Sequence, residues 1–280
     1  MKITWSEIQL RRLKELDADP EHQPAQFDTA EERDKTFQKL EKDLIKHSRR
    51  QLQEFREKLL RPHLCRLESQ LIETLTANGF VQVTTPIIMS RGLLAKMIVE
   101  ETHPLYQQVY WLEKDKCLRP MLAPHLYYVL KDLLRLWEKP VRIFEVGPCF
   151  RKETQGMQHS TEFTMLNLVE MGLAEDQRHR HLEEFTRLVM HTAGLEKYTF
   201  ETQESVVYGQ TIDVIAGHEN LEVGSAAMGP HVLDKAWRIT EAWVGIGFGL
   251  ERLLMAKENS PNLAKMGRSL AYLNGIRMNI

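Results

Sequence analysis

Cysteine is scarce in this sequence: Cys65, Cys117 and Cys149 are the only three among 280 residues. They lie far apart and form no Cys-x-x-Cys pair, which argues against both a disulfide framework and a cysteine-based zinc site. We therefore expect three free thiols, buried or half-buried, in a reducing compartment.

Long apolar runs are also lacking. No uncharged stretch approaches the ~20 residues that span a bilayer. A charged residue, Glu7, follows residues 1–5 closely, so the N-terminal segment has no apolar core of the kind found in a secretory signal peptide. We expect a soluble, cytoplasmic protein.

Neither sign of charge dominates, because 37 basic residues face 39 acidic ones and the formal net charge is −2. Any contact with a polyanion must therefore come from a local patch. One basic excess lies in residues 41–66, and it is compatible either with a solvated helix face carrying i,i+4 ion pairs or with a phosphate-contacting surface. It comprises eight basic residues against four acidic ones: Lys42, Lys46, Arg49, Arg50, Arg56, Lys58, Arg61 and Arg66 against Glu41, Asp43, Glu54 and Glu57.

Hydrophobic residues make up 42% of the chain, enough for a substantial core. Residues 1–60 are rich in charge and predict helices, one of them opening at a capping box in 28–31. Apolar residues recur at three- and four-residue spacing from about 63 to 78, which predicts a long helix ended by Asn78-Gly79. A strand is expected directly after it, at 80–86.

The rest of the chain predicts strands connected mostly by hairpins, with helices before and between them. This order favours an α+β fold with an antiparallel sheet flanked by helices. We expect a helical extension over residues 1–60 and a catalytic domain over 61–280. The remaining predicted elements are a helix opened by Pro124, strands at 141–150 and 162–170, a helix at about 174–193, strands near 198–201, 205–208, 211–215, 221–228 and 243–248, and a helix from 250 to about 257.

Arg151 and Glu153 lie two residues apart at the predicted end of strand 141–150, so both side chains share one face. A guanidinium can meet a phosphate bidentately, and a carboxylate can accept hydrogen bonds from an exocyclic amine such as that of adenine. This pair is followed by His159 and Phe163. The segment is therefore a candidate nucleotide site.

Gly245, Gly247 and Gly249 share one face of a predicted strand, which leaves that face without side chains. Such a face admits either a ligand or a tightly packed neighbouring element. Arg252 follows in the first turn of the next helix, where its guanidinium could stack on an aromatic base. The spacing is not that of a dinucleotide-binding fingerprint.

Asn167 shares a strand face with Phe163, Met165 and Val169. A buried asparagine costs roughly 1–3 kcal/mol unless its amide is paired, so it implies either a polar ligand atom or a fixed protein partner. Farther along, Glu222 and Ser225 carry oxygen atoms suited to magnesium, although this spacing alone is usually structural.

Three segments in order resemble the motifs of class II aminoacyl-tRNA synthetases: the helix and strand that lead to Pro86, the segment from Phe150 to Phe163, and the segment from Gly245 to Arg252. Beyond the class, the similarity runs from about residue 5 to the C-terminus and is to pyrrolysyl-tRNA synthetases, in the form whose catalytic domain is a separate chain. It is carried by Leu118-Arg119-Pro120-Met121-Leu122-Ala123-Pro124, Glu162-Phe163-Thr164-Met165-Leu166-Asn167-Leu168, Val207-Tyr208-Gly209 and Gly247-Phe248-Gly249-Leu250-Glu251-Arg252.

The resemblance implies ATP and Mg²⁺ as cofactors and a role for each motif residue. Arg151 and Arg252 would be catalytic, with Arg151 at the α-phosphate and Arg252 stacking adenine against Phe163. Glu153 would contact the adenine edge, His159 the distal phosphates, and Glu222 with Ser225 would hold magnesium.

On the amino-acid side, the resemblance implies that Asn167 hydrogen-bonds a side-chain amide carbonyl and that Tyr208 covers a pyrroline ring. His125 departs from the family, which has asparagine there, and could alter side-chain preference. The other implied pocket residues are Met121, Leu122, Ala123, Leu126, Tyr127, Leu130, Val169, Ala227, Trp243 and Gly245.

The expected activity is ATP-dependent activation of pyrrolysine, or a similar long lysine derivative, and its transfer to a cognate amber-suppressor tRNA. Expected partners are that tRNA and a second copy of the chain, paired through residues 63–86. The family's extra tRNA-binding module is either encoded as a separate small protein or dispensable. Two alternatives are a class II synthetase for another large side chain, such as phenylalanine, and a catalytically silent synthetase-like binding protein.

Overall fold

The computed structural model describes residues 2–18, 26–152, 160–205, 207–217, 220–260 and 262–280. Its contacts divide the chain into two compact units. The smaller unit comprises Met1–Pro62 and Ser269–Ile280, and the larger one His63–Arg268. Each is described by itself.

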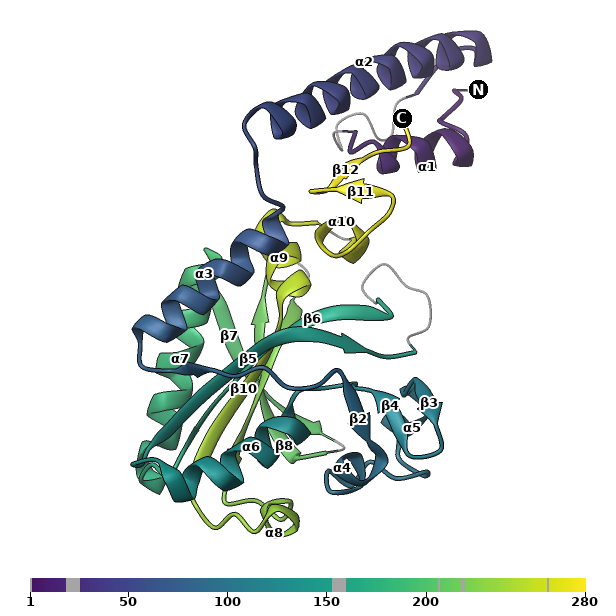
Figure 1. Ribbon diagram of the computed structural model, residues 1–280. Helices are drawn as coiled ribbons and strands as arrows, with labels where there is room; N and C mark the ends of the chain where they lie inside the picture. Colours follow the sequence, from purple (N-terminus) through teal and green to yellow (C-terminus); the bar gives the residue numbers. More distant parts are fainter. Residues whose placement is uncertain (1, 19–25, 153–159, 206, 218–219, 261) are drawn as a thin grey trace. The chain divides into compact units, whose positions relative to one another are not determined.

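The smaller unit contains helices α1 (Glu7–Glu15) and α2 (Ala30–Glu57) and the short strands β11 (Tyr272–Leu273) and β12 (Ile276–Arg277) (Figure 1). Its apolar cluster contains Trp5, Leu13 and Phe27. Helix α2 begins after Thr29, whose side chain accepts from the Glu32 amide, so the capping residue is Thr29. Ser48 is the one buried residue of α2, so most of this helix is accessible to solvent.

The domain boundary differs from the prediction of 61–280, because residues 269–280 group with the N-terminal helices. Arg277 on β12 lies 3.3 Å from the Glu15 carboxylate of α1, and β12 also contacts α2. The sequence expectation missed this grouping because it joins segments from opposite ends of the chain.

The larger unit is built on a seven-stranded sheet with the order β1-β5-β6-β10-β9-β8-β7. All neighbours pair antiparallel except β1, which runs parallel to β5. This arrangement confirms the α+β prediction. The strands are β1 (Val81–Gln82), β5 (Val141–Phe150), β6 (Glu162–Met171), β7 (Tyr198–Ser205), β8 (Gly209–Ala216), β9 (Leu221–Gly229) and β10 (Trp243–Gly249).

Helices cover both faces of this sheet (Figure 1). On one face, α3 (His63–Ala77), α7 (Arg178–Ala193) and α9 (Leu250–Glu258) enclose an apolar core that includes Leu166 and Leu168. On the other, α6 (Ala123–Leu136) packs over a second core that includes Val169 and Met171. Strand β6 thus contributes alternate residues to two cores, as its two-residue period requires.

Smaller elements complete the larger unit. A three-stranded sheet has the order β2-β4-β3. Its strands and the remaining helices are β2 (Ile88–Ser90), α4 (Arg91–Ala95), α5 (Pro104–Gln108), β3 (Trp111–Glu113), β4 (Lys116–Leu118), η2 (Glu175–Gln177), α8 (Asp234–Trp237) and α10 (Leu263–Met266).

Two strand predictions were wrong in extent. The strand expected at 80–86 is much shorter, because β1 spans only Val81–Gln82 and is followed by one further bond from the Val83 amide to the Phe144 carbonyl of β5 at 2.8 Å. Strand β7 is longer than the strand expected at 198–201, because every residue from Tyr198 to Ser205 pairs with β8, whereas Val207 and Tyr208 lie in the turn before β8 and not in the strand expected at 205–208. The β8 partner, not the local sequence, sets the length of β7.

None of the three cysteines, all of them among the described residues, forms a disulfide, and only Cys117 and Cys149 are buried, whereas Cys65 is exposed, contrary to expectation. Burial raises the pKa of Cys117 to about 11 and that of Cys149 to about 12, so both stay protonated near neutral pH. Among the described residues, no helix is both long and apolar enough to cross a membrane.

Candidate active site

A cavity of ≈ 370 Å³ lies in the larger unit, walled by α6 and by one face of β6, β9 and β10. Nearly all the described residues that the sequence analysis assigned to substrates line this cavity. They are Met121, Ala123, Leu126, Tyr127, Leu130, Arg151, Phe163, Asn167, Val169, Tyr208, Glu222, Ser225, Ala227, Trp243, Gly245 and Arg252. Leu122 is the exception. It precedes α6 and is fully buried in the apolar core, so it does not line the cavity.

The predicted strand faces are confirmed on β6 and β10. Phe163, Met165, Asn167 and Val169 all line the cavity, as do Gly245, Gly247 and Gly249. A Cβ atom added at Gly247 would lie 3.3 Å from Cε of Met165 and would project into this wall. The glycine face therefore gives the cavity a floor of bare backbone.

Asn167 has a fixed protein partner. Its Nδ2 donates to the Ile246 carbonyl on the neighbouring strand at 3.1 Å. This bond uses one of the two amide hydrogens and holds the side chain in the cavity wall. Asn167 is half-buried, and of the two explanations for its position the structure supplies the protein partner and leaves the second amide hydrogen for a ligand.

The charged side chains at the end of the cavity have protein partners in this structure. Arg151 donates from Nε to the Pro120 carbonyl at 3.0 Å, and its guanidinium lies 5.3 Å from the centroid of the Phe163 ring. Arg252 lies 3.4 Å from the Glu222 carboxylate. Both arginines are therefore held at the cavity, although Phe163 is flanked here by Arg151 and not by Arg252.

A bulge in β9 brings Glu222 and Ser225 to the same face. Residues three apart in a regular strand point to opposite faces. Here Ile215 pairs with Glu222 but Val214 pairs with Gly224, so Val223 is the extra residue. Both oxygen-bearing side chains consequently line the cavity.

Two predicted ATP contacts, Glu153 and His159, lie outside the described residues. Within the described residues, no group of three or more histidine, cysteine or acidic side chains could hold a metal ion.

Glu251 was missed by the sequence analysis, which used only its neighbour Arg252. Its buried carboxylate accepts from the Thr164 amide at 2.9 Å, which links α9 to β6. Burial raises the pKa of this carboxyl, and the Thr164 amide partly opposes that rise. Glu251 therefore fixes the helix that carries Arg252 against the strand that carries Asn167.

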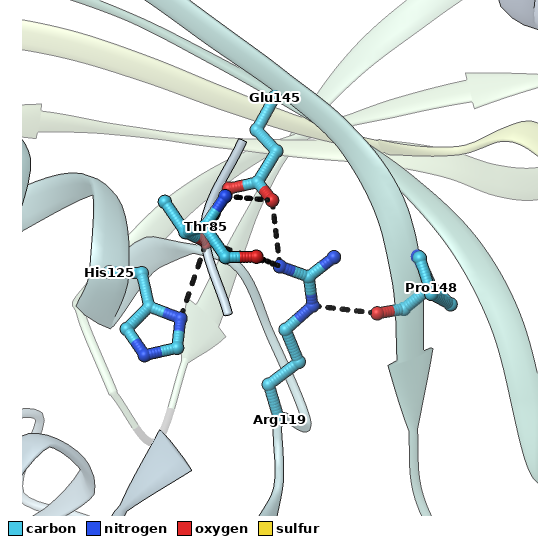
Figure 2. Close-up of polar contacts among 5 residues, drawn as sticks. All are labelled: Thr85, Arg119, His125, Glu145 and Pro148. Atoms are coloured by element: carbon cyan, nitrogen blue, oxygen red, sulfur yellow. Dashed lines mark hydrogen bonds and ion pairs between the residues drawn. The ribbon is translucent and has the colours of Figure 1, made fainter. Parts of the chain in front are cut away.

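A second missed feature is a buried ion pair, shown in Figure 2, between Arg119 and Glu145. Their side chains are 2% and 1% exposed, and Nη1 of Arg119 lies 2.7 Å from Oε1 of Glu145. Arg119 also donates from Nε to the Pro148 carbonyl at 2.8 Å. The guanidinium lies against Gly147, where an added Cβ would be 2.2 Å from Nη2.

Thr85 joins this pair to the segment before Pro86 (Figure 2). Its hydroxyl donates to Glu145 at 2.7 Å and accepts from Arg119 at 3.1 Å. Since a hydroxyl has a single hydrogen, the 3.3 Å contact with Nδ1 of His125 requires that nitrogen to carry a proton. Burial, followed by the charge of Arg119, lowers the pKa of His125.

This cluster ties three segments together at the start of α6 and the end of β5. The backbone adds to it, because the Phe150 amide donates to the Arg119 carbonyl at 3.0 Å. The cluster therefore supports Arg151, the residue after Phe150. An arginine and a glutamate within otherwise apolar stretches were the sequence signal that could have revealed it.

The family described as tRNA synthetases class II core domain (F) matches residues 50–274. The chain belongs to this family. That assignment agrees with the antiparallel sheet, the cavity on its face and the two arginines there.

Individual relatives are also similar. A crystal structure of pyrrolysyl-tRNA synthetase from Desulfitobacterium hafniense superposes with a TM-score of 0.92 at 50% identity, covering 99% of this chain and 98% of that one. A second structure, of PylSc from the same organism, gives 0.89 at 49% identity and covers 99% and 95%. The lysine–tRNA ligase of Variovorax paradoxus (strain S110) is 28% identical over 205 residues, which is 71% of this chain but only 36% of that ligase.

Proposed function

We propose that this protein activates pyrrolysine, or a similar long lysine derivative, with ATP and transfers it to a cognate amber-suppressor tRNA. The observation that carries the proposal is the 50% identity to a pyrrolysyl-tRNA synthetase over nearly the full length of both chains. A synthetase for phenylalanine would not account for that similarity. A catalytically silent relative would be expected to lose Arg151 or Arg252, and both line the cavity.

The reaction proceeds in two transfers. The amino-acid carboxylate attacks the α-phosphorus of ATP and pyrophosphate leaves. The terminal ribose hydroxyl of tRNA then attacks the carbonyl carbon of the aminoacyl-adenylate and loses its proton, which forms the ester and releases AMP. Arg151 and Arg252 stabilise the negative charge that develops on the phosphoryl oxygens. Positioning and charge stabilisation suffice for such a transfer, so no covalent nucleophile is required.

Glu222 and Ser225 would hold Mg²⁺. Their carboxylate and hydroxyl oxygens face the cavity together, and the Ser225 hydroxyl donates to Asp213 at 2.6 Å, which leaves its lone pairs available to a cation. Bound magnesium would neutralise charge on the phosphates. Arg252 already holds the Glu222 carboxylate beside the cavity.

The amino-acid side chain occupies the apolar part of the cavity. Tyr208 covers its far end, and the second Nδ2 hydrogen of Asn167 donates to the amide carbonyl that a lysine derivative carries. A site built to hydrogen-bond such a carbonyl rejects side chains that lack it, because its own polar group would remain unpaired. This property separates long lysine derivatives from apolar side chains of similar bulk.

The proposal is tested by ATP–pyrophosphate exchange with a panel of amino acids. We expect exchange with pyrrolysine and with ring-bearing Nε-acyl-lysines, and little with phenylalanine or lysine. Exchange with phenylalanine alone would support the first alternative, and no exchange with any member of the panel would support the second.

Helix α2 is the proposed tRNA-contacting surface. Arg49 and Arg50 are exposed on it, and Arg50 lies 3.3 Å from Glu54, an i,i+4 partner. The ion pair supports the i,i+4 interpretation for Arg50, and we propose phosphate contact for the exposed basic side chains beside it. Replacing Arg49 and Arg50 by Glu should weaken tRNA charging at low salt and make its dependence on salt shallower, because fewer phosphates are neutralised, without changing pyrophosphate exchange. An unchanged charging rate would exclude this surface.

A homodimer through residues 63–86 is part of the proposal. Strand β1 lies at the edge of the sheet, and Val81, Ile87 and Ile88 are 46%, 43% and 52% exposed. An unpaired edge beside exposed apolar side chains favours association. Sedimentation measures it directly. The separate small tRNA-binding protein and the cytoplasmic location also remain proposals.

A further inference from the structure

The strand register defines the two ends of the cavity. Trp243 begins β10 and Gly249 ends it, so these residues are separated by about 20 Å of strand. Arg252 follows the Gly249 end, whereas Tyr127 packs edge to face on Trp243 with ring centroids 5.8 Å apart. Tyr208 lies 6.1 Å from Trp243 by the same measure. Three aromatic residues therefore close the end remote from Arg252.

A carboxylate that the proposed function does not use lies against these aromatic residues. Asp234, the first residue of α8, is 2% exposed and is not part of the cavity wall described above. It accepts from the Tyr127 hydroxyl at 3.2 Å and from Nε1 of Trp243 at 2.9 Å. The His231 amide donates to it at 2.6 Å. One buried side chain thus holds two residues of the cavity wall.

The indole of Trp243 is held at opposite edges. Its Nε1 edge faces Asp234 and lies against the backbone of Gly229, where an added Cβ would be only 1.8 Å away. Its Cζ3 edge lies 3.4 Å from the Cβ position of Gly245, on the bare floor of the cavity. The bond to Asp234 therefore sets how far the indole projects over that floor.

The Tyr127 ring is held in the same way. It stacks on Trp237 at 5.3 Å between centroids, and its hydroxyl is directed to Asp234. Burial, with smaller contributions from Tyr208 and the Asp234 charge, raises the pKa of Tyr127, so the hydroxyl keeps its proton and remains a donor.

His231 links the same segment to Tyr208. The Leu233 amide donates to Nδ1 of His231, so Nε2 carries the hydrogen and donates to the Tyr208 carbonyl at 3.0 Å. Residues 231–234 thereby contact Tyr127, Tyr208 and Trp243, the three aromatic residues that close the cavity.

We propose that Asp234 is a positioning residue for amino-acid specificity: by holding Tyr127 and Trp243, it fixes the shape of the cavity where a ring-bearing side chain ends. This inference rests on the proposed function. Asp234 touches no ligand itself, and it lies at the end of the cavity remote from Arg252.

The test compares Asp234→Ala with the unchanged protein in ATP–pyrophosphate exchange. The readout is the ratio of kcat/KM for a ring-bearing Nε-acyl-lysine to that for Nε-acetyl-lysine, whose shorter side chain does not reach the aromatic end. We expect the ratio to fall at least tenfold while the KM for ATP stays unchanged. An unchanged ratio, or an equal loss for both amino acids, overturns the inference.

Asp234→Asn is the rescue variant. Its amide oxygen accepts from Trp243, and the Tyr127 hydroxyl can reverse and accept from its amide nitrogen, so the ratio should stay within about threefold of the unchanged protein. A tenfold fall in Asp234→Asn would overturn the positioning role. If Asp234→Ala does not fold, Asp234→Ser takes its place with the same expectation.

Glu170→Gln is the matched control. Glu170 is a fully buried carboxylate on β6 that pairs with Arg142 and His181 and does not line the cavity. Its replacement should lower the thermal midpoint and leave the ratio unchanged, and a similar fall in ratio would overturn the inference. If the unchanged protein exchanges with no lysine derivative, the proposed function itself fails, which is a separate outcome.

Discussion

At one end of the cavity the side chains are charged and partly exposed, whereas at the other they are aromatic and buried. The Arg252 and Glu222 side chains are 30% and 47% exposed, but Tyr127 and Trp243 are 5% and 3% exposed. Both ends stand on the same strands of one sheet. The difference fits the two proposed substrates, because phosphates and a hydrated cation bind best to charged side chains in contact with water, whereas a side chain is discriminated best where water is excluded.

The two ends are also supported differently. An ion pair, Arg119 with Glu145, braces the strand end before Arg151, whereas neutral donors on Tyr127 and Trp243 satisfy Asp234 at the aromatic end. Losing one member of a buried ion pair leaves an uncompensated charge. We therefore expect the charged end to tolerate substitution less.

The largest expected effect is at the charged end. Replacing Arg151 by Ala should reduce the rate of pyrophosphate exchange by about 10²–10³-fold or more, because the charge that stabilises the transition state is lost. Circular dichroism should show an unchanged fold. Arg135→Ala is the control, since that side chain is 73% exposed at the end of α6. Exchange retained by the Arg151 variant would refute its catalytic role.

The ion pair between Arg119 and Glu145 can be disrupted without replacing either charged residue. Gly147→Ala places a methyl group 2.2 Å from Arg119 and should displace the guanidinium from Glu145. We expect a loss of about 3–5 kcal/mol in the free energy of unfolding, measured with denaturant. Gly92→Ala is the matched control, because an added Cβ there meets nothing within 4 Å. Equal stability of the two variants would contradict this prediction.

Asn167→Ala should affect the amino-acid substrate selectively. The loss of one ligand hydrogen bond in a buried site is worth about 1–3 kcal/mol, so kcat/KM for a lysine derivative should fall roughly 5- to 150-fold. The KM for ATP should not change, because Asn167 pairs with Gly247 on β10 and so lies nearer the aromatic end of the cavity than Phe163 does. A parallel rise in the KM for ATP would remove the functional distinction between the two ends.

The smallest effect concerns acid stability. The pKa of His125 is lowered in the folded protein, so the folded state disfavours the protonated form. Its contribution to stability is present above its ordinary pKa of about 6.5 and is lost as pH falls below that value. His125→Asn should therefore make the loss of stability between about pH 7 and 5 shallower.

The His125→Asn variant should still lose some stability as pH falls, because the pKa of His63 is also lowered by burial. His191→Asn is the control, since this side chain is 74% exposed. An identical acid slope in the His125 and His191 variants would rule out a contribution from His125.

The local sequence was sufficient to predict the face of β6 that carries Phe163 and Asn167 and the bare face of β10. Strand periodicity is a local property, so alternate residues can be assigned to one face without knowing what pairs with them. The same holds for the helix His63–Ala77, whose apolar spacing and Asn-Gly end were both visible in the sequence. The resemblance of the three motifs then connected these faces to ATP and an amino acid.

Tertiary structure decided what depends on distant partners. The bulge that turns Glu222 and Ser225 to one face arises from pairing with β8. The grouping of residues 269–280 with the N-terminal helices and the contacts of Arg119 and Asp234 join segments far apart in the chain. The sequence alone determined which side chains alternate and which motifs are present. Only the folded chain decided which buried charges meet, because a buried charge is tolerated only where the fold supplies its partners.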